Sequence, residues 1–536
     1  MKNTLPLLVV VALALLLRVV NLGSVPYWDW DEGGNLNYAT NLAGGYVQFF
    51  AYKYHFMSHP PLYFMFLAVW FKLFGATIHS IRLFSVACSM AGLVLVYSLV
   101  SRFLAEKTAI FSVMIYAVYP ELVFWGRMGF ANNLLGVLAV ASMYYIILFL
   151  KGRNTRDLLL SGFLSGLCAI TEYTGFIFVV AFAIVLYLFS RESLLKGISA
   201  AAVPPMLFAG YIILFDLNGF QKDLGASVGL YPLAVPLIVL AVALFGGFSK
   251  YVLAYFDSLD LSIGKETPAE LFVFVILCLL SIAPLDSLSI FSGKMTYAFI
   301  LMSLLGILFI PDRVLRTTLL SFAMGYSLLL VAINRWDHMS IPLHYVISCA
   351  PVFFLQKVGA YLRPRMPTIW VAVLALPLIT AFWVDYGAFA ANGLCSAPVA
   401  DFGMLNDFIN QRTTSDDVVA TYSYLAPGLN AKTTIMETVL PYNGLPFAYN
   451  RRKYDQSEYV LNLSTENIKY FVLPAGYIEA RDDPVNVKLR NWTAIYRLYQ
   501  RQVRTEPSAP FGLRFFGGSE ICAGEYVVLE NPNYGK

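Results

Sequence analysis

The chain has 536 residues, of which 58% are hydrophobic and only 13% are charged. Soluble domains carry about 25% charged residues, so this composition excludes an ordinary soluble enzyme and predicts that most of the chain lies in a membrane. The net charge of +4 is small for this length. Nothing in the sequence suggests the concentrated basic face of a nucleic-acid-binding protein, and we expect no nucleic-acid partner.

Long apolar stretches follow one another through most of the chain. The first, residues 5–22, lacks the small-residue cleavage site of a signal peptide, so we expect it to be retained as a helix. Because a helix needs about 20 residues to cross the hydrocarbon core, the stretches predict about thirteen transmembrane helices. The predicted ranges are 5–22, 82–103, 107–119, 131–150, 158–170, 175–189, 195–215, 231–248, 269–283, 297–310, 318–333, 343–361 and 369–384.

Residues 60–75 form a shorter apolar stretch that either spans the membrane or lies along its surface. Basic residues collect in cytoplasmic loops. If residues 60–75 do not span the membrane, these basic residues lie on one side of it: Lys107, the loop 151–156 and the later basic residues. We therefore predict an outer-surface juxtamembrane helix here and a cytoplasmic N-terminus. The segments then predicted to lie outside are the loop 23–81, residues 120–130, Glu172 and the loop 334–341.

The composition becomes polar from about residue 395. Three runs in this region, 417–422, 468–473 and 525–529, are rich in the β-branched and aromatic residues that favour strands. Helical or loop segments separate them. The pattern predicts a small α/β fold rather than further membrane helices.

We accordingly expect a transmembrane domain over residues 1–390 and a soluble α/β domain over residues 391–536. An odd number of spans places this second domain outside the cytoplasm. Cys395 and Cys522 lie near its two ends. In an oxidising compartment they would either form a disulfide or remain free, because sequence does not supply the geometry that a disulfide requires.

A cluster of carboxylates follows the first predicted helix, in the segment Trp28-Asp29-Trp30-Asp31-Glu32. In many membrane proteins such a segment is a solvated loop with interfacial tryptophans. The functional alternative is a general base held at the membrane surface, because partial burial raises the pKa of a carboxylate and makes it a better proton acceptor near neutral pH.

Basic residues come next, at Lys53, His55 and His59, the last of which opens the motif His59-Pro60-Pro61-Leu62. Prolines fix the entry of the following helix, so one interpretation is a histidine that caps this helix. The other is a set of hydrogen-bond donors that face an anionic ligand at the lipid surface.

Arg127 and Arg335 lie at predicted outer helix ends, where snorkelling to lipid headgroups is the ordinary explanation. Both fall on the face that basic residues usually avoid, which favours a specific role, and arginine suits bidentate binding of phosphate. Glu172 interrupts an apolar stretch between two predicted helices. It either belongs to a short polar turn or, as an ionisable residue near the membrane, serves the function.

This order of motifs resembles the membrane glycosyltransferases of the GT-C class. The nearest resemblance is to the branch that contains dolichyl-phosphate-mannose–protein mannosyltransferases and ArnT-like lipid A aminoarabinose transferases. It covers the first two hundred residues well and the later helices in general layout. The motifs that carry it are Asp31-Glu32, His59-Pro60-Pro61-Leu62 with Tyr63, Phe74-Gly75, Arg82-Leu83-Phe84-Ser85, and Tyr119-Pro120 before Arg127.

The resemblance implies an α-helical polytopic protein of GT-C type in the cell membrane, with its active site and C-terminal domain outside. It implies inverting transfer of a hexose or pentose from a polyprenyl (dolichyl) phosphate carrier to a protein, lipid or glycan acceptor. Asp31 would deprotonate the acceptor hydroxyl, and Glu32 would support it or contact the sugar. Candidates for binding the lipid phosphate or sugar are Asp29, Lys53, His55, His59, Arg82, Arg127, Glu172, Arg335 and His338.

The sequence departs from this family at several positions. Related chains often carry lysine at the place of Glu172, an acidic residue at the place of Asn132-Asn133, and an arginine at the place of His344. These differences leave the sugar and the details of phosphate binding open. No HExxH or CxxC metal motif occurs; Asp31 could ligate Mg²⁺ or Mn²⁺, but the spacing of the carboxylates does not require a metal.

Two other functions remain open. A transporter or binding protein for a lipid-linked substrate would carry ionisable residues at mid-membrane depth, whereas here the polar groups collect at the outer helix ends. The segment Trp383-Val384-Asp385-Tyr386-Gly387 nearly matches the WWDYG signature of oligosaccharyltransferases. In that family the signature lies in the soluble domain, whereas here it ends the last predicted membrane helix.

Overall fold

The computed structural model describes most of the helical part and the core of the C-terminal sheet. The predicted helices at 231–248, 269–283 and 369–384 lie outside the described residues, as do Cys395 and Cys522. The described residues are 4–20, 22, 30–44, 60–215, 217, 294–333, 338–362, 399–421, 428–435, 447–448, 468–474, 489–499 and 525–534.

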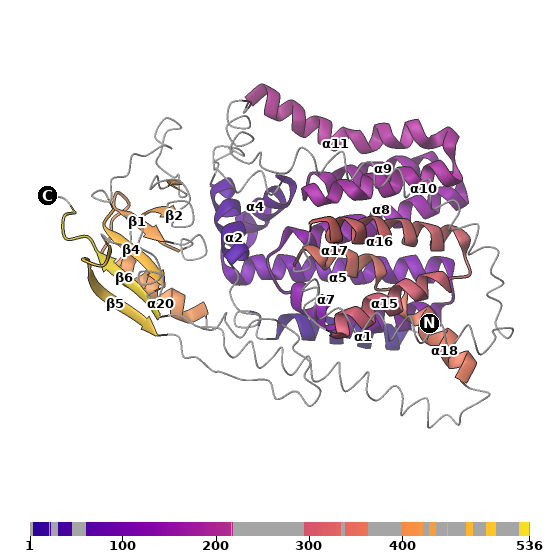
Figure 1. Ribbon diagram of the computed structural model, residues 1–536, viewed down its shortest axis with the longest axis horizontal. Coiled ribbons are helices and arrows are strands. Elements are labelled where there is room, and N and C mark those ends of the chain that lie inside the picture. The colour runs from indigo at the N-terminus through magenta and orange to yellow at the C-terminus, as the bar shows by residue number, and fades with distance from the viewer. Residues whose placement is uncertain are drawn as a thin grey trace.

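The helices form a bundle whose long members run side by side, with α2 and α4 lying across one end (Figure 1). They are α1 (Thr4–Val19), α2 (Trp30–Ala43), α4 (Leu62–Phe74), α5 (Ile78–Phe103), α6 (Glu106–Val118), α7 (Pro120–Trp125), α8 (Ala131–Gly152), α9 (Thr155–Ala169), α10 (Phe176–Phe189), α11 (Leu194–Phe215), α15 (Lys294–Leu308), α16 (Arg313–Ile333), α17 (Ile341–Ile347) and α18 (Pro351–Leu362).

Three helical segments of the described part are long and apolar enough to cross a membrane: α5, α8 and residues 191–215. The predicted helix 343–361 is interrupted, because α17 and α18 meet at a bend of 50°. Pro351 opens α18 and has no backbone N–H to continue the preceding helix. Counted as one span, the bent pair would make a fourth candidate among the described residues.

Helix α2 was not predicted, since the outer loop 23–81 was expected to contain a helix only at 60–75. Its sequence mixes polar and small residues, but Leu36, Tyr38 and Ala39 are buried. The ring of Tyr38 packs edge-on against Phe64 of α4, with 5.5 Å between the centroids. Tertiary packing therefore stabilises a helix that has no apolar signature of its own.

Helix α4 has only 13 residues, fewer than the roughly 20 that a span needs. One face, including Tyr63, Phe64 and Leu67, is buried against the bundle. The opposite face exposes Val69 and Leu73, which are 61% and 72% accessible. An apolar outer face on a helix that lies across the bundle end suits a position in the membrane interface.

The C-terminal part forms a six-stranded sheet of order β3-β2-β1-β4-β6-β5. Its strands β2, β1 and β4 are parallel, and the remaining pairs are antiparallel. The runs predicted at 417–422, 468–473 and 525–529 are confirmed as β1, β4 and β6. The elements are α20 (Val399–Asn410), β1 (Val418–Thr421), β2 (Lys432–Ile435), β3 (Phe447–Ala448), β4 (Tyr470–Pro474), β5 (Thr493–Tyr499) and β6 (Glu525–Glu530).

Candidate functional site

A buried ion pair joins the first turn of α2 to the beginning of α5. Arg82 donates from Nε and Nη2 to the two carboxylate oxygens of Glu32, at 2.9 and 2.8 Å. Both side chains are fully buried. Burying a charge is costly unless it is paired and hydrogen-bonded, and this two-pronged contact meets that requirement and fixes the direction of the Glu32 side chain.

The peptide at Gly129 completes the surroundings of Glu32. Its N–H donates to Glu32 Oε1 at 2.8 Å, and its carbonyl accepts from Asn35 Nδ2 at 2.8 Å. A Cβ atom on Gly129 would lie 2.6 Å from the side chain of Ile81 and 3.1 Å from Glu32 Cγ. The backbone can approach α2 this closely only because residue 129 has no side chain.

Two arginines also hold the end of α1. Arg82 Nη1 donates to the carbonyl of Leu22 at 2.8 Å. Arg127 donates to the carbonyls of Leu17, at 3.0 Å, and Val20. The last carbonyls of a helix lack partners within it, and a cation there also opposes the helix dipole. Arg82 thus bridges the end of α1 and the start of α2.

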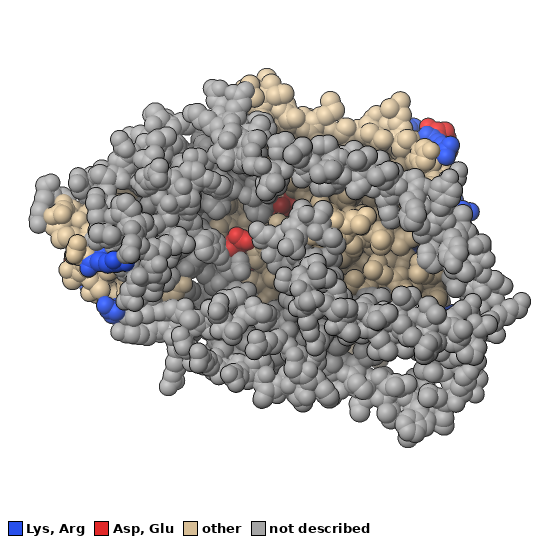
Figure 2. Space-filling model, in the orientation of Figure 1, with Lys and Arg blue, Asp and Glu red and all other residues tan. Residues whose placement is uncertain are grey.

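Asp31 differs sharply from its neighbour Glu32. Its side chain is 52% accessible, and its carboxylate lies 4.0 Å from Nε2 of His338, whose side chain is 11% accessible. The imidazole of His338 stacks on Phe130 with 4.6 Å between the ring centroids. The space-filling view shows acidic side chains near the middle of this face of the molecule (Figure 2). The two adjacent carboxylates therefore have different environments, because Glu32 is fully buried and Asp31 is half exposed.

Glu172 lies at the same end of the bundle and is buried. It is close enough to Tyr63 and Tyr326 to interact with them electrostatically. The amide of Leu62, in the Pro-Pro motif at the start of α4, donates to the carbonyl of Ile170 at 3.1 Å. The turn that carries Glu172 therefore packs directly against the start of α4.

The turn before α17 joins the same assembly. Tyr326 Oη donates to the carbonyl of Met339 at 2.9 Å and lies 3.4 Å from Thr174 Oγ1. Four segments far apart in the sequence thus meet at one end of the bundle: the start of α2, the start of α4, the turn 170–175 and the turn 338–340. Asp31, Glu32, Arg82, Arg127, Glu172 and His338 belong to this assembly or pack against it.

Asp29, Lys53, His55, His59 and Arg335 lie outside the described residues. Among the residues that the structure does describe, no group of three or more His, Cys, Asp or Glu side chains could hold a metal ion.

Arg18 is a fully buried charge that was not among the site residues predicted from the sequence. Its guanidinium donates to Ser89 Oγ at 2.8 Å and to the carbonyls of Ala14, Ala117 and Tyr116 at 3.0 to 3.3 Å. An arginine inside an apolar helix is itself a signal of a special position. Here it ties α1 to α5 and α6.

Comparison with known families matches part of the chain. Residues 58–215 fit the model described as dolichyl-phosphate-mannose-protein mannosyltransferase. A comparison with curated protein sequences gives no significant match.

Solved structures share the fold across the chain. ArnT from Cupriavidus metallidurans bound to undecaprenyl phosphate is 11% identical, with a TM-score of 0.53 and 99% of each chain covered. The apo form of that protein is 11% identical with a TM-score of 0.55, and all of both chains is covered. The Archaeoglobus fulgidus oligosaccharyltransferase, tethered to an acceptor peptide with the NVT sequon, is 14% identical with a TM-score of 0.54. In that comparison 89% of this chain and 69% of the other are covered.

At these identities the structural likeness establishes the fold, and the family match adds a sequence signal over 58–215. The resemblance recognised in the sequence is thereby confirmed: this chain has the fold of the GT-C membrane glycosyltransferases and matches the mannosyltransferase family model over its α4–α11 region.

Proposed function

We propose that this protein is an inverting glycosyltransferase that takes a sugar from a polyprenyl-phosphate carrier and passes it to a protein, lipid or glycan acceptor. The contrast between Asp31 and Glu32 carries the proposal. Glu32 is fully buried and held by Arg82, whereas Asp31 is half exposed on the adjacent helical position. A rigid carboxylate anchor beside an accessible carboxylate is the arrangement that a positioned general base requires.

In this proposal Asp31 accepts the proton of the acceptor hydroxyl while the hydroxyl oxygen attacks the anomeric carbon. The bond from that carbon to the phosphate oxygen breaks, and the polyprenyl phosphate leaves as an anion. Attack opposite to the leaving group inverts the configuration. Glu32 and Arg82 act as positioning residues, because neither has accessible surface with which to touch a substrate.

The developing phosphate charge needs fixed cations or hydrogen-bond donors. Arg127 is buried and donates to the end of α1, so we assign it to positioning rather than to direct phosphate contact. Among the residues that the structure describes, we propose His338, which faces Asp31, as a hydrogen-bond donor to the substrate. Lys53, His55, His59 and Arg335 remain proposed phosphate ligands from the sequence alone.

The proposed outer location of the site rests on the distribution of basic residues. At the bundle end opposite Glu32, the ends and turns of α8 to α11 and α16 carry a group of cations, as is usual for cytoplasmic loops. Members of this group are Lys151, Arg153, Arg156, Arg191, Lys196, Arg313 and Arg316. The other end would then face outward and meet a carrier in the outer leaflet.

The test is sugar transfer by purified full-length protein from synthetic polyprenyl-phosphate hexoses and pentoses, with Asp31→Asn compared with wild type. We expect a loss of about 10²-fold or more in rate, the contribution of a positioned general base. Asp157→Asn, at the first turn of α9, is the matched control and should retain the wild-type rate. An arm with EDTA reports whether a divalent cation takes part.

Peptide, lipid and glycan acceptors are supplied in parallel, which separates the protein-acceptor and lipid-acceptor alternatives. If folded protein binds the donor lipid but neither transfers nor hydrolyses the sugar with any donor, the enzymatic proposal is overturned in favour of a transporter or binding protein. An Asp31→Asn variant as active as wild type would instead remove Asp31 from the role of base.

A further inference from the structure

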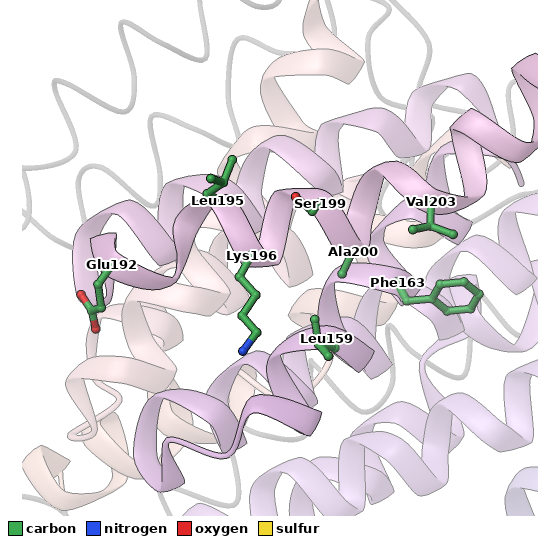
Figure 3. Close-up of a pocket in the computed structure, with 8 residues that line it drawn as sticks. All are labelled: Leu159, Phe163, Glu192, Leu195, Lys196, Ser199, Ala200 and Val203. Carbon is green, nitrogen blue, oxygen red and sulfur yellow. The ribbon is translucent and has the colours of Figure 1, made fainter.

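A groove runs along the surface between α9 and α11, away from the site described above. Its volume is about 730 Å³, within the 300–1,000 Å³ range typical of small-molecule sites. Apart from Glu192, Lys196 and Ser199, its lining is apolar (Figure 3). The residues that line it are Leu159, Phe163, Glu192, Leu195, Lys196, Ser199, Ala200 and Val203.

The two helices approach closely beneath this groove because small residues face each other. A Cβ atom on Gly166 would lie 2.2 Å from the carbonyl oxygen of Ala201. Such contacts are the usual means of packing helices in a membrane. The larger side chains of Leu159 and Phe163 stand on one side of the contact, and Val203 stands on the other. The groove is thus a fixed feature of a tightly packed helix pair.

One end of the groove carries a positive charge, that of Lys196, without an ion-pair partner among the described residues. Lys196 extends from α11 into the space between the helices (Figure 3), and within the described residues no hydrogen bond or ion pair involves it. Glu192 is the acidic residue of the lining, but its carboxylate accepts from Ser190 at 2.6 Å and from Arg153 at 3.3 Å. Glu192 is therefore engaged elsewhere.

The position of Lys196 along the bundle matches a headgroup level. Helix α10 begins beside the turn of Glu172 and ends at Phe189, so α11 begins at the opposite end of the bundle. Lys196 is in the first turn of α11 and Val203 lies about 10 Å further along, at 1.5 Å per residue. The cation thus stands at the bundle end and the apolar lining extends inward from it.

We propose that this groove binds an anionic phospholipid, with one acyl chain along Leu159, Phe163 and Val203 and the phosphate at Lys196. The apolar rim supports a lipid: Leu195 is 79% and Val203 is 42% accessible, and acyl chains cover such side chains in a bilayer. A lysine whose stem lies along apolar surface and whose ammonium reaches the headgroup level is the expected partner of an anionic headgroup.

The test uses full-length protein incubated with vesicles of phosphatidylcholine containing phosphatidylglycerol, followed by native mass spectrometry of retained lipid. Wild type should retain phosphatidylglycerol in preference to phosphatidylcholine. Lys196→Gln should lower phosphatidylglycerol retention about fivefold, the usual effect of one lysine at an anionic surface. Lys107→Gln, at the same bundle end on α6, should leave it unchanged.

A second variant tests the groove independently of charge. Ser199→Phe places a ring in the groove and should reduce retention of both lipids while Lys196 remains. A photoreactive benzophenone residue at position 163 should then cross-link to lipid in the otherwise wild-type protein.

The proposal is overturned if Lys196→Gln retains phosphatidylglycerol as wild type does, or if phosphatidylglycerol is retained no better than phosphatidylcholine. It is equally overturned if Ser199→Phe retains lipid normally. Cross-links from position 163 to residues 218–293 of the same chain, or to a second copy, would assign the groove to protein instead of lipid.

Discussion

The two ends of the helical bundle treat charge in opposite ways. At the end with α2 and α4, Glu32, Arg82, Arg127 and Arg18 are all buried, and each of these groups has hydrogen bonds with carboxylate, carbonyl, amide or hydroxyl partners. At the opposite end, the pair of Arg153 and Glu192 is 56% and 72% accessible.

This difference indicates that buried charges serve to position functional groups at the end of the bundle with α2 and α4. Removing one partner of a buried ion pair costs about 3–5 kcal/mol because it leaves an uncompensated charge, whereas exposed pairs contribute about 0–1 kcal/mol. A network of buried charges is therefore an expensive way to stabilise a protein. It is well suited to fixing the position of a neighbouring group, here the exposed carboxylate of Asp31.

The largest effect should follow from breaking the buried pair. Glu32→Gln leaves the Arg82 charge uncompensated, so we expect a loss of about 3–5 kcal/mol in the free energy of unfolding and a markedly lower melting temperature in detergent. Glu192→Gln, at the exposed end, should not measurably change it. Equal melting temperatures for the two variants would remove the contrast between the ends.

A second comparison concerns the close approach of the backbone. Gly129→Ala would place a methyl group 2.6 Å from Ile81, and overpacking of this kind costs about 1–3 kcal/mol. Gly152→Ala is the matched change near the other end, where nothing lies within 4 Å of the added atom. Thermal unfolding should separate the two variants, and transfer activity should fall only for Gly129→Ala, because its shift moves Glu32.

Asp417, in the C-terminal sheet, has a side-chain burial between that of Glu32 and that of Glu192. Partial burial alone would raise the pKa of this carboxyl, but hydrogen bonds from Thr414, Tyr534 and Lys469 lower it below the usual value overall. Because the folded-state pKa is depressed, this stabilisation is present above the unfolded-state pKa of about 3.9 and is lost as pH falls through the folded value.

Asp417→Asn should therefore destabilise the sheet by about 1 kcal/mol near neutral pH. In full-length protein this would accelerate hydrogen exchange in β1 and β4. The difference from wild type should shrink in acid, once the wild-type carboxyl is protonated. A difference that persists undiminished at low pH would assign the effect to shape rather than to charge.

The long apolar helices were the most predictable part of the fold. A membrane span needs an uninterrupted apolar run, so α5 and α8 were located within a few residues. Helix α2 left no such signal, because contacts with α4 stabilise it rather than its own composition. The bend before α18 did have a signal, since Pro351 cannot continue a helix.

The grouping of several candidate residues at one end of the bundle was predictable, whereas their contacts were not. The predicted spans and the positive-inside rule indicated that Asp31, Glu32, Glu172 and His338 share one end of the bundle. No local pattern indicated that Arg82 would pair with Glu32, fifty positions away in the chain. Gly129 carried no distinguishing signal, because its requirement arises only from the packing of α2 against the turn before α8.

The shortness of α10, a helix predicted from its apolar sequence to cross the membrane, has a consequence for the bilayer. Helix α10 has 14 residues, so it measures about 21 Å, and a hydrocarbon core is about 30 Å thick. A membrane accommodates a short span by thinning around it. We therefore expect the lipid–water boundary to dip beside the turn that carries Glu172. Such a dip would lower the lipid headgroups beside this end of the bundle, where the turn of Glu172 packs against the start of α4.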